Sequence, residues 1–451
     1  SSFAYDRCCR MTAATDAAGN TSRWAYDGCG NVVAETDAAG ATVRYGRDSR
    51  GRVAWEEDAL GARTSYEYDA KGRAVAVTDP LGNRSTAQWD ADFDVAVAET
   101  DPMGNVTLRE AGALGQVLRE VRADGSEETA EWGPGGTLLA STDGAGARTA
   151  YTWTAAGRLA KVDREGAVWA FQWDTTGNLA ESVAPNGNRT AYQWSAAGQL
   201  TAADDDAGPV GRWGFDRCGR QVWEEDGLGQ RSGYEYDRLG NLVAATDAAG
   251  NRAAYQWDAA GNLVAVTAAN GARTAVAYDA AGRPVQITDA LGNSRSAAYD
   301  AAGRLVSVTD ALGNETRYGY DAAGNQVEAA HPDGTTEAWG YDPCGNAVST
   351  TDALGRTTML EYDFMGRLVA ASDDEGPLLT AAYDGEGRVL ASTDALGRQW
   401  LCRYDDWGNL SEAEAPGGAV QQWQWDAMGN LARYTDQRGG TWAYAYDAAA
   451  R

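Results

Sequence analysis

The chain has 451 residues and a formal charge of −27, with 55 Gly, 21 Tyr and 17 Trp but only 5 Phe and one His. Nucleic-acid affinity rests largely on Lys and Arg that neutralise phosphates, so 65 acidic against 38 basic side chains exclude nucleic acid and anionic membranes as expected partners. No apolar run approaches the roughly 20 residues that span a bilayer, so no direct membrane insertion is expected.

The six cysteines are Cys8, Cys9, Cys29, Cys218, Cys344 and Cys402. They are scattered through a long chain without the density of a disulfide-stapled domain, and none forms a Cys-x-x-Cys pair, so reduced thiols are expected. Cys29, Cys218 and Cys344 occupy one position just before a turn Gly, which indicates a tolerated small residue rather than three nucleophiles.

A position that is usually Tyr or Trp recurs along the chain with a period of 21 residues, and we call it the anchor. The residue after the anchor is Asp at 18 of the 22 anchors. From Tyr5 to Tyr446 the distance is 441 residues, or 21 times 21, so the anchors bound 21 repeats. Two intervals deviate: 22 residues from Trp89 to Ala111 and 20 from Trp153 to Trp173. The anchors are Tyr5, Tyr26, Arg47, Tyr68, Trp89, Ala111, Trp132, Trp153, Trp173, Trp194, Phe215, Tyr236, Trp257, Tyr278, Tyr299, Tyr320, Tyr341, Tyr362, Tyr383, Tyr404, Trp425 and Tyr446.

Each repeat is predicted to contain two strands and two turns, as residues 299–320 show. A turn ending at Gly303 leads into a strand over 304–309, and a second turn over 310–314 reverses the chain into a strand over 315–320. The anchor Asp is expected to fix the following turn. No segment shows a sustained 3.6-residue period, so the chain is predicted to be all-β.

Alternation places the anchor and the aromatic residue two positions before it on one face of the strand, as for Tyr318 and Tyr320. This pattern predicts an aromatic ladder in which stacked or edge-to-face rings join neighbouring repeats. About 42 strands would form one long antiparallel sheet that winds into a coil or wall, since large flat sheets are not expected. Residues 1–451 are therefore predicted to be a single repeat array, expected to be a piece of a longer protein.

The array has two kinds of irregularity. Arg47 and Ala111 interrupt the aromatic ladder, and the stretch 90–97 contains one extra residue. We expect a bulge or bend of the sheet there.

The motif Tyr-Asp-x-x-Gly-[Arg/Asn]-Leu, as in Tyr299-Asp-Ala-Ala-Gly-Arg-Leu, resembles the YD repeats of Rhs-type proteins over essentially the whole chain. These repeats occur in Rhs polymorphic toxins, in the B and C components of insecticidal toxin complexes, in wall-associated bacterial proteins and in teneurins. The resemblance implies a spiralling antiparallel β-sheet that forms a hollow shell, or cocoon, around a C-terminal toxin segment.

The resemblance to such toxins also implies a modular chain, with an N-terminal targeting part, a plug with an autoproteolytic Asp-Pro-x-Gly-Leu motif, and a variable toxin. This chain contains only repeats. Asp79-Pro80 and Asp101-Pro102 resemble the cleavage motif, but both are in register with ordinary turns and are interpreted as turns.

Segments that depart from the repeat are the candidates for a catalytic or binding site. Each of them can also be interpreted as an ordinary structural part of the repeat. The run 204–206 of three Asp could bind a hard cation but lies at a turn. The segments 55–58 and 223–226, both Trp-Glu-Glu-Asp, could be a sugar-cleaving carboxylate pair, but they share one repeat phase and duplication explains them better. His331 lies in a turn. No catalytic, cofactor-binding or metal-binding residue is assigned.

The leading hypothesis is that the chain is a structural shell segment of an Rhs-type secreted polymorphic toxin, not an enzyme, and encapsulates a toxin cargo before delivery. It implies other segments of the same polypeptide and a secretion apparatus as partners, and secretion or delivery to target cells after synthesis in the bacterial cytoplasm. The alternative is a cell-surface adhesion or carbohydrate-binding module whose Tyr and Trp faces stack on sugar rings.

Overall fold

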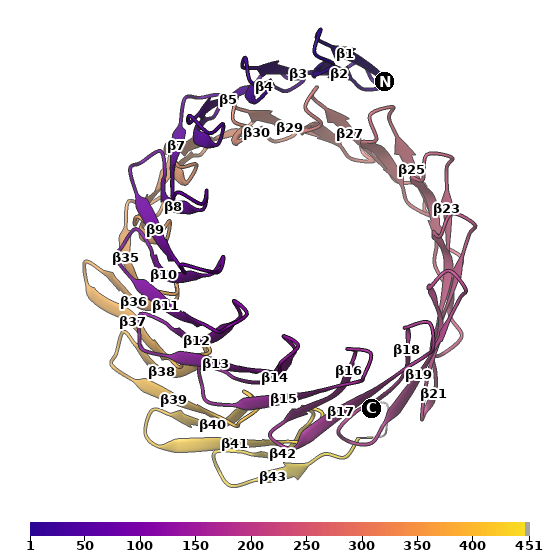
Figure 1. The fold of residues 1–451 in the computed structure, drawn as a ribbon, viewed down its shortest axis with the longest axis vertical. Helices are drawn as coiled ribbons and strands as arrows, with labels where there is room; N and C mark the ends of the chain where they lie inside the picture. The colour runs from indigo at the N-terminus through magenta and orange to yellow at the C-terminus, as the bar shows by residue number, and fades with distance from the viewer. Residues whose placement is uncertain (447–451) are drawn as a thin grey trace. The chain divides into compact units, whose positions relative to one another are not determined.

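The computed structural model describes residues 1–446, and within them it forms an antiparallel sheet of 43 strands (Figure 1). The predicted all-β fold is therefore confirmed. Residues 1–446 contain no helix that is long and apolar enough to cross a membrane. The last anchor Asp, Asp447, falls outside the described part of the chain.

The odd-numbered strands carry the aromatic residues, and all but the last end on a predicted anchor. They are β1 (Ser2–Tyr5), β3 (Thr21–Tyr26), β5 (Thr42–Arg47), β7 (Arg63–Tyr68), β9 (Arg84–Trp89), β11 (Val106–Ala111), β13 (Glu127–Trp132), β15 (Arg148–Trp153), β17 (Ala167–Trp173), β19 (Arg189–Trp194), β21 (Gly208–Phe215), β23 (Arg231–Tyr236), β25 (Arg252–Trp257), β27 (Arg273–Tyr278), β29 (Ser294–Tyr299), β31 (Glu315–Tyr320), β33 (Thr336–Tyr341), β35 (Thr357–Tyr362), β37 (Gly376–Tyr383), β39 (Gln399–Tyr404), β41 (Ala419–Trp425) and β43 (Thr441–Ala443).

The even-numbered strands are mostly five residues long and rich in small and β-branched residues. They are β2 (Met11–Thr15), β4 (Val32–Thr36), β6 (Val53–Glu57), β8 (Ala74–Thr78), β10 (Ala96–Thr100), β12 (Val117–Val121), β14 (Leu138–Thr142), β16 (Leu159–Arg164), β18 (Leu179–Val183), β20 (Leu200–Asp205), β22 (Gln221–Asp226), β24 (Leu242–Thr246), β26 (Leu263–Thr267), β28 (Pro284–Thr288), β30 (Leu305–Thr309), β32 (Gln326–Ala330), β34 (Ala347–Thr351), β36 (Leu368–Asp373), β38 (Val389–Asp394), β40 (Leu410–Ala415) and β42 (Leu431–Thr435).

Two compact units can be distinguished, each assembled from separate stretches of the chain. Unit 1 comprises 1–87, 100–104 and 233–357, and unit 2 comprises 88–99, 105–232 and 358–451. Within a unit, strands pair antiparallel with the next strand along the chain, as β3 with β4 and β15 with β16.

A β-bulge recurs immediately before the anchor, which sequence analysis did not predict as a general feature. In β3 and β4, Ala25 pairs with Ala34 but Tyr26 pairs with Val32, so one residue of the short strand is extra. The same shift occurs between Ala298 and Tyr299. Bulges add local twist, so each repeat carries its own source of sheet twist.

A bulge or bend of the sheet was expected at the extra residue near position 90, and this residue lies in a turn. It enlarges the turn after Trp89, where the N–H of Asp90 donates to the carbonyl of Val95, five residues on. In the other turns this bond spans four residues, as from Asp27 to Asn31. A turn absorbs an insertion without changing which face each strand residue occupies, which is why it is favoured over a strand bulge.

The buried core is thin and consists of alanines. In the described chain the hydrophobic residues classed as buried are all Ala, and no large side chain is fully buried. Ala76, Ala140, Ala244 and Ala265 are between 0% and 3% exposed, on the face opposite the anchors. Stability must therefore come from contacts between adjacent strands rather than from a central core.

Candidate functional site at the turn edges and seams

The sheet has two edges of turns, and they are named here by the strands that lead into them. Edge A comprises the turns that follow odd-numbered strands, such as 27–30, and edge B comprises the turns that follow even-numbered strands, such as 16–19. On both edges a hydrogen bond from the Gly N–H to the Asp carbonyl closes the turn, as for Gly30 and Asp27.

Where a turn begins with Asp, the Asp carboxylate holds the turn, as predicted. Asp27 Oδ1 accepts the N–H groups of Cys29 and Asn31 at 2.8 and 2.9 Å, and Oδ2 accepts the Asn31 side-chain amide at 2.9 Å. The Asn31 amide, the Asn31 N–H and then the N–H of Cys29 lower the pKa of Asp27. The carboxylates of both edges are thus directed into their own turns.

Arg at the position after the turn Gly joins one repeat to the next, whereas Asn serves its own turn. Arg10 Nε donates to Asp6 at 2.6 Å, and its Nη1 donates to the carbonyl of Asp27 in the next edge A turn at 3.1 Å. Its guanidinium lies 4.9 Å from the ring centre of Tyr26. The same link to the next edge A turn is made by Arg52, Arg158, Arg283, Arg304 and Arg367.

The anchor side chain donates a hydrogen bond to the first residue of the even-numbered strand that precedes its own strand. Tyr68 Oη donates to the carbonyl of Val53 at 2.8 Å, and Trp194 Nε1 donates to that of Leu179 at 2.7 Å. The same bond is made by the anchors Tyr26, Trp132, Trp153, Trp173, Trp257, Tyr278, Tyr299, Tyr320, Tyr341, Tyr383, Tyr404, Trp425 and Tyr446. Tyr and Trp, unlike Phe, have a polar atom for this bond, which explains the scarcity of Phe.

These bonds revise the expected aromatic ladder. Anchors of successive repeats are two strands apart, about 9.6 Å, which is too far for rings to stack. Rings meet where the intervening short strand also carries an aromatic residue: the Tyr434 ring centre lies 5.6 Å from that of Trp442, on which it stacks, and 5.6 Å from that of Trp423, to which it is tilted. The contact between repeats at most anchors is therefore a hydrogen bond to the backbone.

On the sheet face opposite the anchor side chains, three neighbouring residues on successive strands are complementary in size, so that a large side chain lies beside a small one. Where the middle residue is Ala76, Glu67 and Arg84 form an ion pair across it. Where the middle residue is Trp55, the flanking residue is Gly46, and a Cβ added there would overlap the indole ring. Other triplets of this kind are Gly214, Trp223, Arg231, then Glu131, Ala140, Arg148, and Glu235, Ala244, Arg252.

In unit 2, edge B of an early stretch contacts edge A of a late stretch, and we call this contact a seam. Glu386 Oε1 accepts the N–H of Gly144 at 2.8 Å, and Arg122 donates to the carbonyl of Gly385 at 3.3 Å. A Cβ at Gly385 would lie 2.6 Å from the carbonyl oxygen of Gly144. The backbones of these two turns therefore approach closely.

A second contact in the same seam is aromatic. The rings of Trp169 and Trp407 are 5.5 Å apart, and the Arg164 guanidinium lies 6.0 Å from the Trp407 ring. Arg164 also donates to the carbonyl of Asp406 at 3.5 Å. Arg164 and Asp406 are 242 residues apart in the sequence, as are Gly144 and Glu386.

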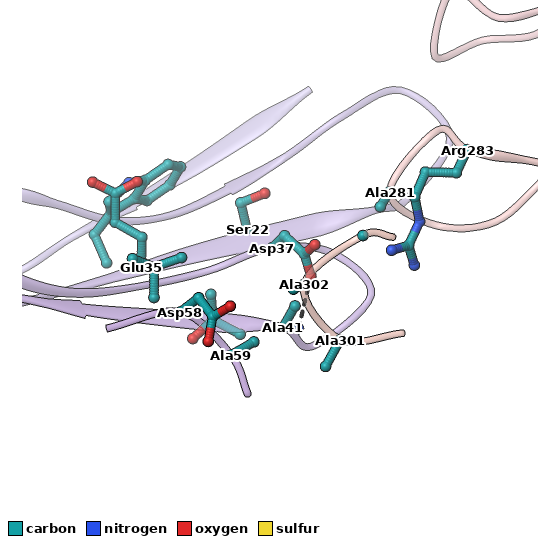
Figure 2. Close-up of a pocket in the computed structure, with 14 residues that line it drawn as sticks. Ser22, Glu35, Asp37, Ala41, Asp58, Ala59, Ala281, Arg283, Ala301 and Ala302 are labelled. Atoms are coloured by element: carbon teal, nitrogen blue, oxygen red, sulfur yellow. Dashed lines mark hydrogen bonds between the residues drawn. The ribbon is translucent and has the colours of Figure 1, made fainter. Parts of the chain in front are cut away.

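Unit 1 has the equivalent seam, which contains a groove of about 360 Å³. Asp37 and Asp58 line it from edge B, while Ala281 and Ala301 face them from edge A (Figure 2). Asp37 accepts the N–H of Ala41, and Asp58 accepts those of Leu60 and Ala62. The carboxylates that line this groove therefore hold turns.

Further along the unit 1 seam, a thiol meets an edge B turn. Burial and then the carboxylate of Asp101 raise the pKa of Cys344. Cys344 is thus a small residue of edge A at the seam. Cys29, Cys218 and Cys344, which share this repeat position, are all exposed.

The three carboxylates of the acidic run 204–206 each have different partners and do not converge on one point. Asp204 pairs with Arg212, Asp205 accepts N–H groups within its own turn, and Asp206 accepts the N–H of Arg189. Among residues 1–446 no group of three His, Cys, Asp or Glu side chains is placed to hold a metal ion.

The paired carboxylates at 56 and 57 do not face each other, since they lie at adjacent positions of one strand. Glu56 accepts the hydroxyl of Tyr66 at 2.7 Å on the anchor face, and Glu57 pairs with Arg63. Burial and then the hydrogen bond to Glu56 raise the pKa of Tyr66 to about 12. A glycosidase needs both carboxylates directed at one bond, which this arrangement does not provide.

The remaining singled-out residues lie in turns. His331 and Gly334 close an edge B turn, and the His331 ring is 3.6 Å from Glu337. Asp79 caps its turn through the N–H groups of Leu81 and Asn83. Asp101 accepts the N–H of Met103 in the same way.

Sequence reasoning missed the seam residues. Glu386 and Trp407 stand where most edge A turns have Ala, Leu or Cys, so their departure from the repeat was the available signal. Their partners, 242 and 238 residues away, left no local pattern.

The geometry defines a tandem-repeat β-sheet protein whose repeats are joined by polar contacts. A family model described as the RHS repeat matches residues 10–42, 26–57, 47–84, 156–189, 173–210, 215–252, 257–294, 299–336, 383–420 and 404–440. The matched ranges cover more than half of the chain, which therefore belongs to the RHS repeat family.

Solved structures share the fold at low sequence identity. The crystal structure of TcdB2-TccC3-TEV has a TM-score of 0.61 and 14% identity, over 92% of this chain and 30% of that one. That of TcdB2-TccC3-Cdc42 has a TM-score of 0.54 and 12% identity, over 99% and 38%. The Tc holotoxin pore of Photorhabdus luminescens has 0.52 and 12%, over 96% and 29%.

The chain thus spans about a third of the length of these matching chains. No curated protein matches it.

Proposed function

We propose that this chain is a wall segment of the shell of an Rhs-type secreted toxin, in which residues 1–451 act as one array that encloses a C-terminal toxin cargo. The observation that carries the proposal is the RHS repeat match, together with a fold shared over 92% of the chain with TcdB2-TccC3-TEV. The proposed role is structural rather than enzymatic. The proposed partners are the targeting, plug and toxin segments of the same polypeptide and a secretion apparatus.

The contacts between repeats and between distant turns are those that a continuous wall of β-sheet would need. Anchor bonds and the Arg links join each repeat to the next, as Tyr68 and Arg52 do. Seams join turns that are 242 residues apart. A net charge of −27 would keep such a large β surface soluble and discourage pairing of exposed backbone.

The aromatic residues give no support to the alternative of carbohydrate binding by an aromatic face. Among residues 1–446, the strongly exposed rings lie near the two ends of the described chain, at Phe3, Tyr5, Trp442, Tyr444 and Tyr446. Trp55 is covered by Arg63 at 3.9 Å and Trp223 by Arg231 at 4.0 Å. An arginine guanidinium therefore covers one face of each of these two indole rings, the face on which a sugar ring would stack.

Limited proteolysis of the full-length gene product tests the proposal. We expect the segment downstream of the repeats to be cut at least tenfold more slowly inside the full-length protein than when produced alone. Mass spectrometry of the fragments would identify the protected stretch. Equal cleavage rates in the two preparations would contradict enclosure.

A further inference from the structure

The groove in the unit 1 seam has more carboxylates than cations on its walls, and both walls are internal stretches of the chain. Glu35, Asp37 and Asp58 line one wall. Arg283 lies at the end of the groove away from Glu35 (Figure 2). Its guanidinium is already paired, because Nε donates to the Asp279 carboxylate at 2.7 Å. The groove therefore has an excess of negative charge.

Asp37 and Asp58 each use only one carboxylate oxygen to hold their turns. In most turns the residue four positions after Asp is Asn or Arg, whose side chain donates to Oδ2. In the turns of Asp37 and Asp58 this residue is Ala41 and Ala62, respectively, and the turn N–H groups bond to Oδ1. Among residues 1–446, no side chain donates a hydrogen bond to Oδ2 of either Asp. Two carboxylate oxygens at the groove thus remain available as acceptors.

The Glu35 carboxylate is available as well. Other glutamates recur at the same repeat position, and each accepts a hydrogen bond from a Tyr, Arg or Gln side chain: Glu56, Glu99, Glu120 and Glu224. Within the described part of the chain, no hydrogen bond or ion pair holds the exposed Glu35 side chain. Its carboxylate lines the groove instead.

Unit 2 shows which group takes such an oxygen. Asp143 begins the same kind of turn, again with Ala four positions on, and its Oδ2 accepts a hydrogen bond from Arg164 at 3.1 Å. The Arg164 guanidinium also donates to a backbone carbonyl across the seam and lies 6.0 Å from the Trp407 ring centre. Arg164 stands 21 residues after Asp143, whereas the residue 21 positions after Asp37 is Asp58. Unit 1 therefore has an acidic residue where unit 2 has a guanidinium.

We propose that the groove of the unit 1 seam binds the guanidinium group of a ligand, as Asp143 binds Arg164 in unit 2. The available acceptors are Oδ2 of Asp37 and of Asp58 and the Glu35 carboxylate, and a guanidinium has five N–H donors in one plane. Trp24 lines the groove beside Glu35, its cross-strand partner, and has an indole face on which that plane can lie. The inference does not depend on the enclosure of a cargo.

A ligand-observed NMR titration tests the proposal with two probes, n-butylguanidinium and a capped arginine, N-acetylarginine methylamide. Both are expected to bind with a dissociation constant of about 1 mM or below. Tighter binding of the capped arginine would support an arginine side chain of a polypeptide as the source of the group, and tighter binding of butylguanidinium a small molecule. If neither probe saturates the chain by about 10 mM, the proposal is overturned.

Variants locate the site. The triple variant E35Q, D37N, D58N removes three charges but keeps the side-chain oxygens that accept the turn N–H groups, and it is expected to bind at least tenfold more weakly. E35Q alone disturbs no hydrogen bond of the chain and is expected to weaken binding about threefold, which keeps the test valid if the triple variant does not fold. Circular dichroism would verify folding. Unchanged affinity in E35Q and in a folded triple variant would contradict the proposal.

A matched control removes three charges of unit 1 away from the groove. Oδ2 of Asp289 and of Asp310 already accepts an Asn side chain, and Glu328 lies on a strand outside the groove. The variant D289N, D310N, E328Q is expected to bind both probes within about twofold of the wild type. If it loses as much affinity as the groove variant, the probes follow net charge rather than the groove, and the proposal is wrong.

Discussion

Arg47 donates two hydrogen bonds to the carbonyl oxygen of Val32, from Nε at 3.2 Å and from Nη2 at 2.7 Å. This is the bond that Tyr68 makes to Val53 one repeat later. The residue predicted to interrupt the anchors therefore performs the anchor's bond, because guanidinium and phenol groups of similar reach can each donate to a backbone carbonyl.

Replacing Arg47 tests that equivalence. We expect R47Y to keep the native stability within about 0.5 kcal/mol, whereas R47A should lose about 1–3 kcal/mol because the partly buried Val32 carbonyl loses its donors. Since repeat arrays open locally, hydrogen exchange of the amides in β4 and β5 is the measurement. If R47Y loses as much protection as R47A, the bond is not the stabilising feature.

The size match of Gly46 and Trp55 is expected to appear in a double-mutant cycle. G46E alone would force a side chain into the indole ring, and W55A alone would remove the surface that Arg63 covers. Together they recreate the arrangement of Glu67, Ala76 and Arg84. We expect the double variant to be more stable than the sum of the single changes by about 1–3 kcal/mol in chemical denaturation. Additive losses would show that the two sites are independent.

Cys9 occupies the turn position that Gly fills in neighbouring repeats, with a φ of 61°. Because a side chain costs about 1–2 kcal/mol in this left-handed conformation, C9G is expected to stabilise the first hairpin by about 1 kcal/mol. G30A, at a φ of 94°, is the matched control and is expected to destabilise its own hairpin. Hydrogen exchange in β2 and β4 would measure both, and a loss of protection in C9G would contradict the interpretation.

Acid is expected to unfold the sheet through its turns. The hydroxyl of Thr176 and then the N–H of Asn178 lower the pKa of Asp174 to about 2 from the ordinary 3.8. A carboxyl whose folded pKa is depressed contributes stability that is complete above the unfolded value and is lost as pH falls through the folded value.

The same direction holds for Asp16, whose pKa is lowered first by the Asn20 side chain, and for Asp48, where the Arg52 side chain is the main cause. Stability should therefore be constant from about pH 7 to 5 and fall between pH 3.8 and about 2. Urea denaturation followed by circular dichroism at a series of pH values is the measurement. D174N should flatten part of this dependence, and an unchanged profile would argue against Asp174 as a contributor.

The sequence by itself determined the elements of this protein, because their signals are local. The strand predicted over 304–309 is observed as Leu305–Thr309, and the one over 315–320 as Glu315–Tyr320. Asp and Gly at set spacing specify a turn through bonds within a few residues, and alternation specifies the two faces. No catalytic residue was assigned because the candidate segments fit the same repeating pattern of strands and turns.

Tertiary structure decided the contacts that cross strands or join distant turns. The partner of Tyr68 is a backbone carbonyl, which any residue at position 53 would provide, so no side-chain pattern marks it. The extra residue near Asp90 enlarged a turn because a bulge would have disturbed the pairing of a whole strand. Trp407 met Trp169 only because the tertiary fold of unit 2 brings edge B of one stretch against edge A of another, 238 residues away in the sequence.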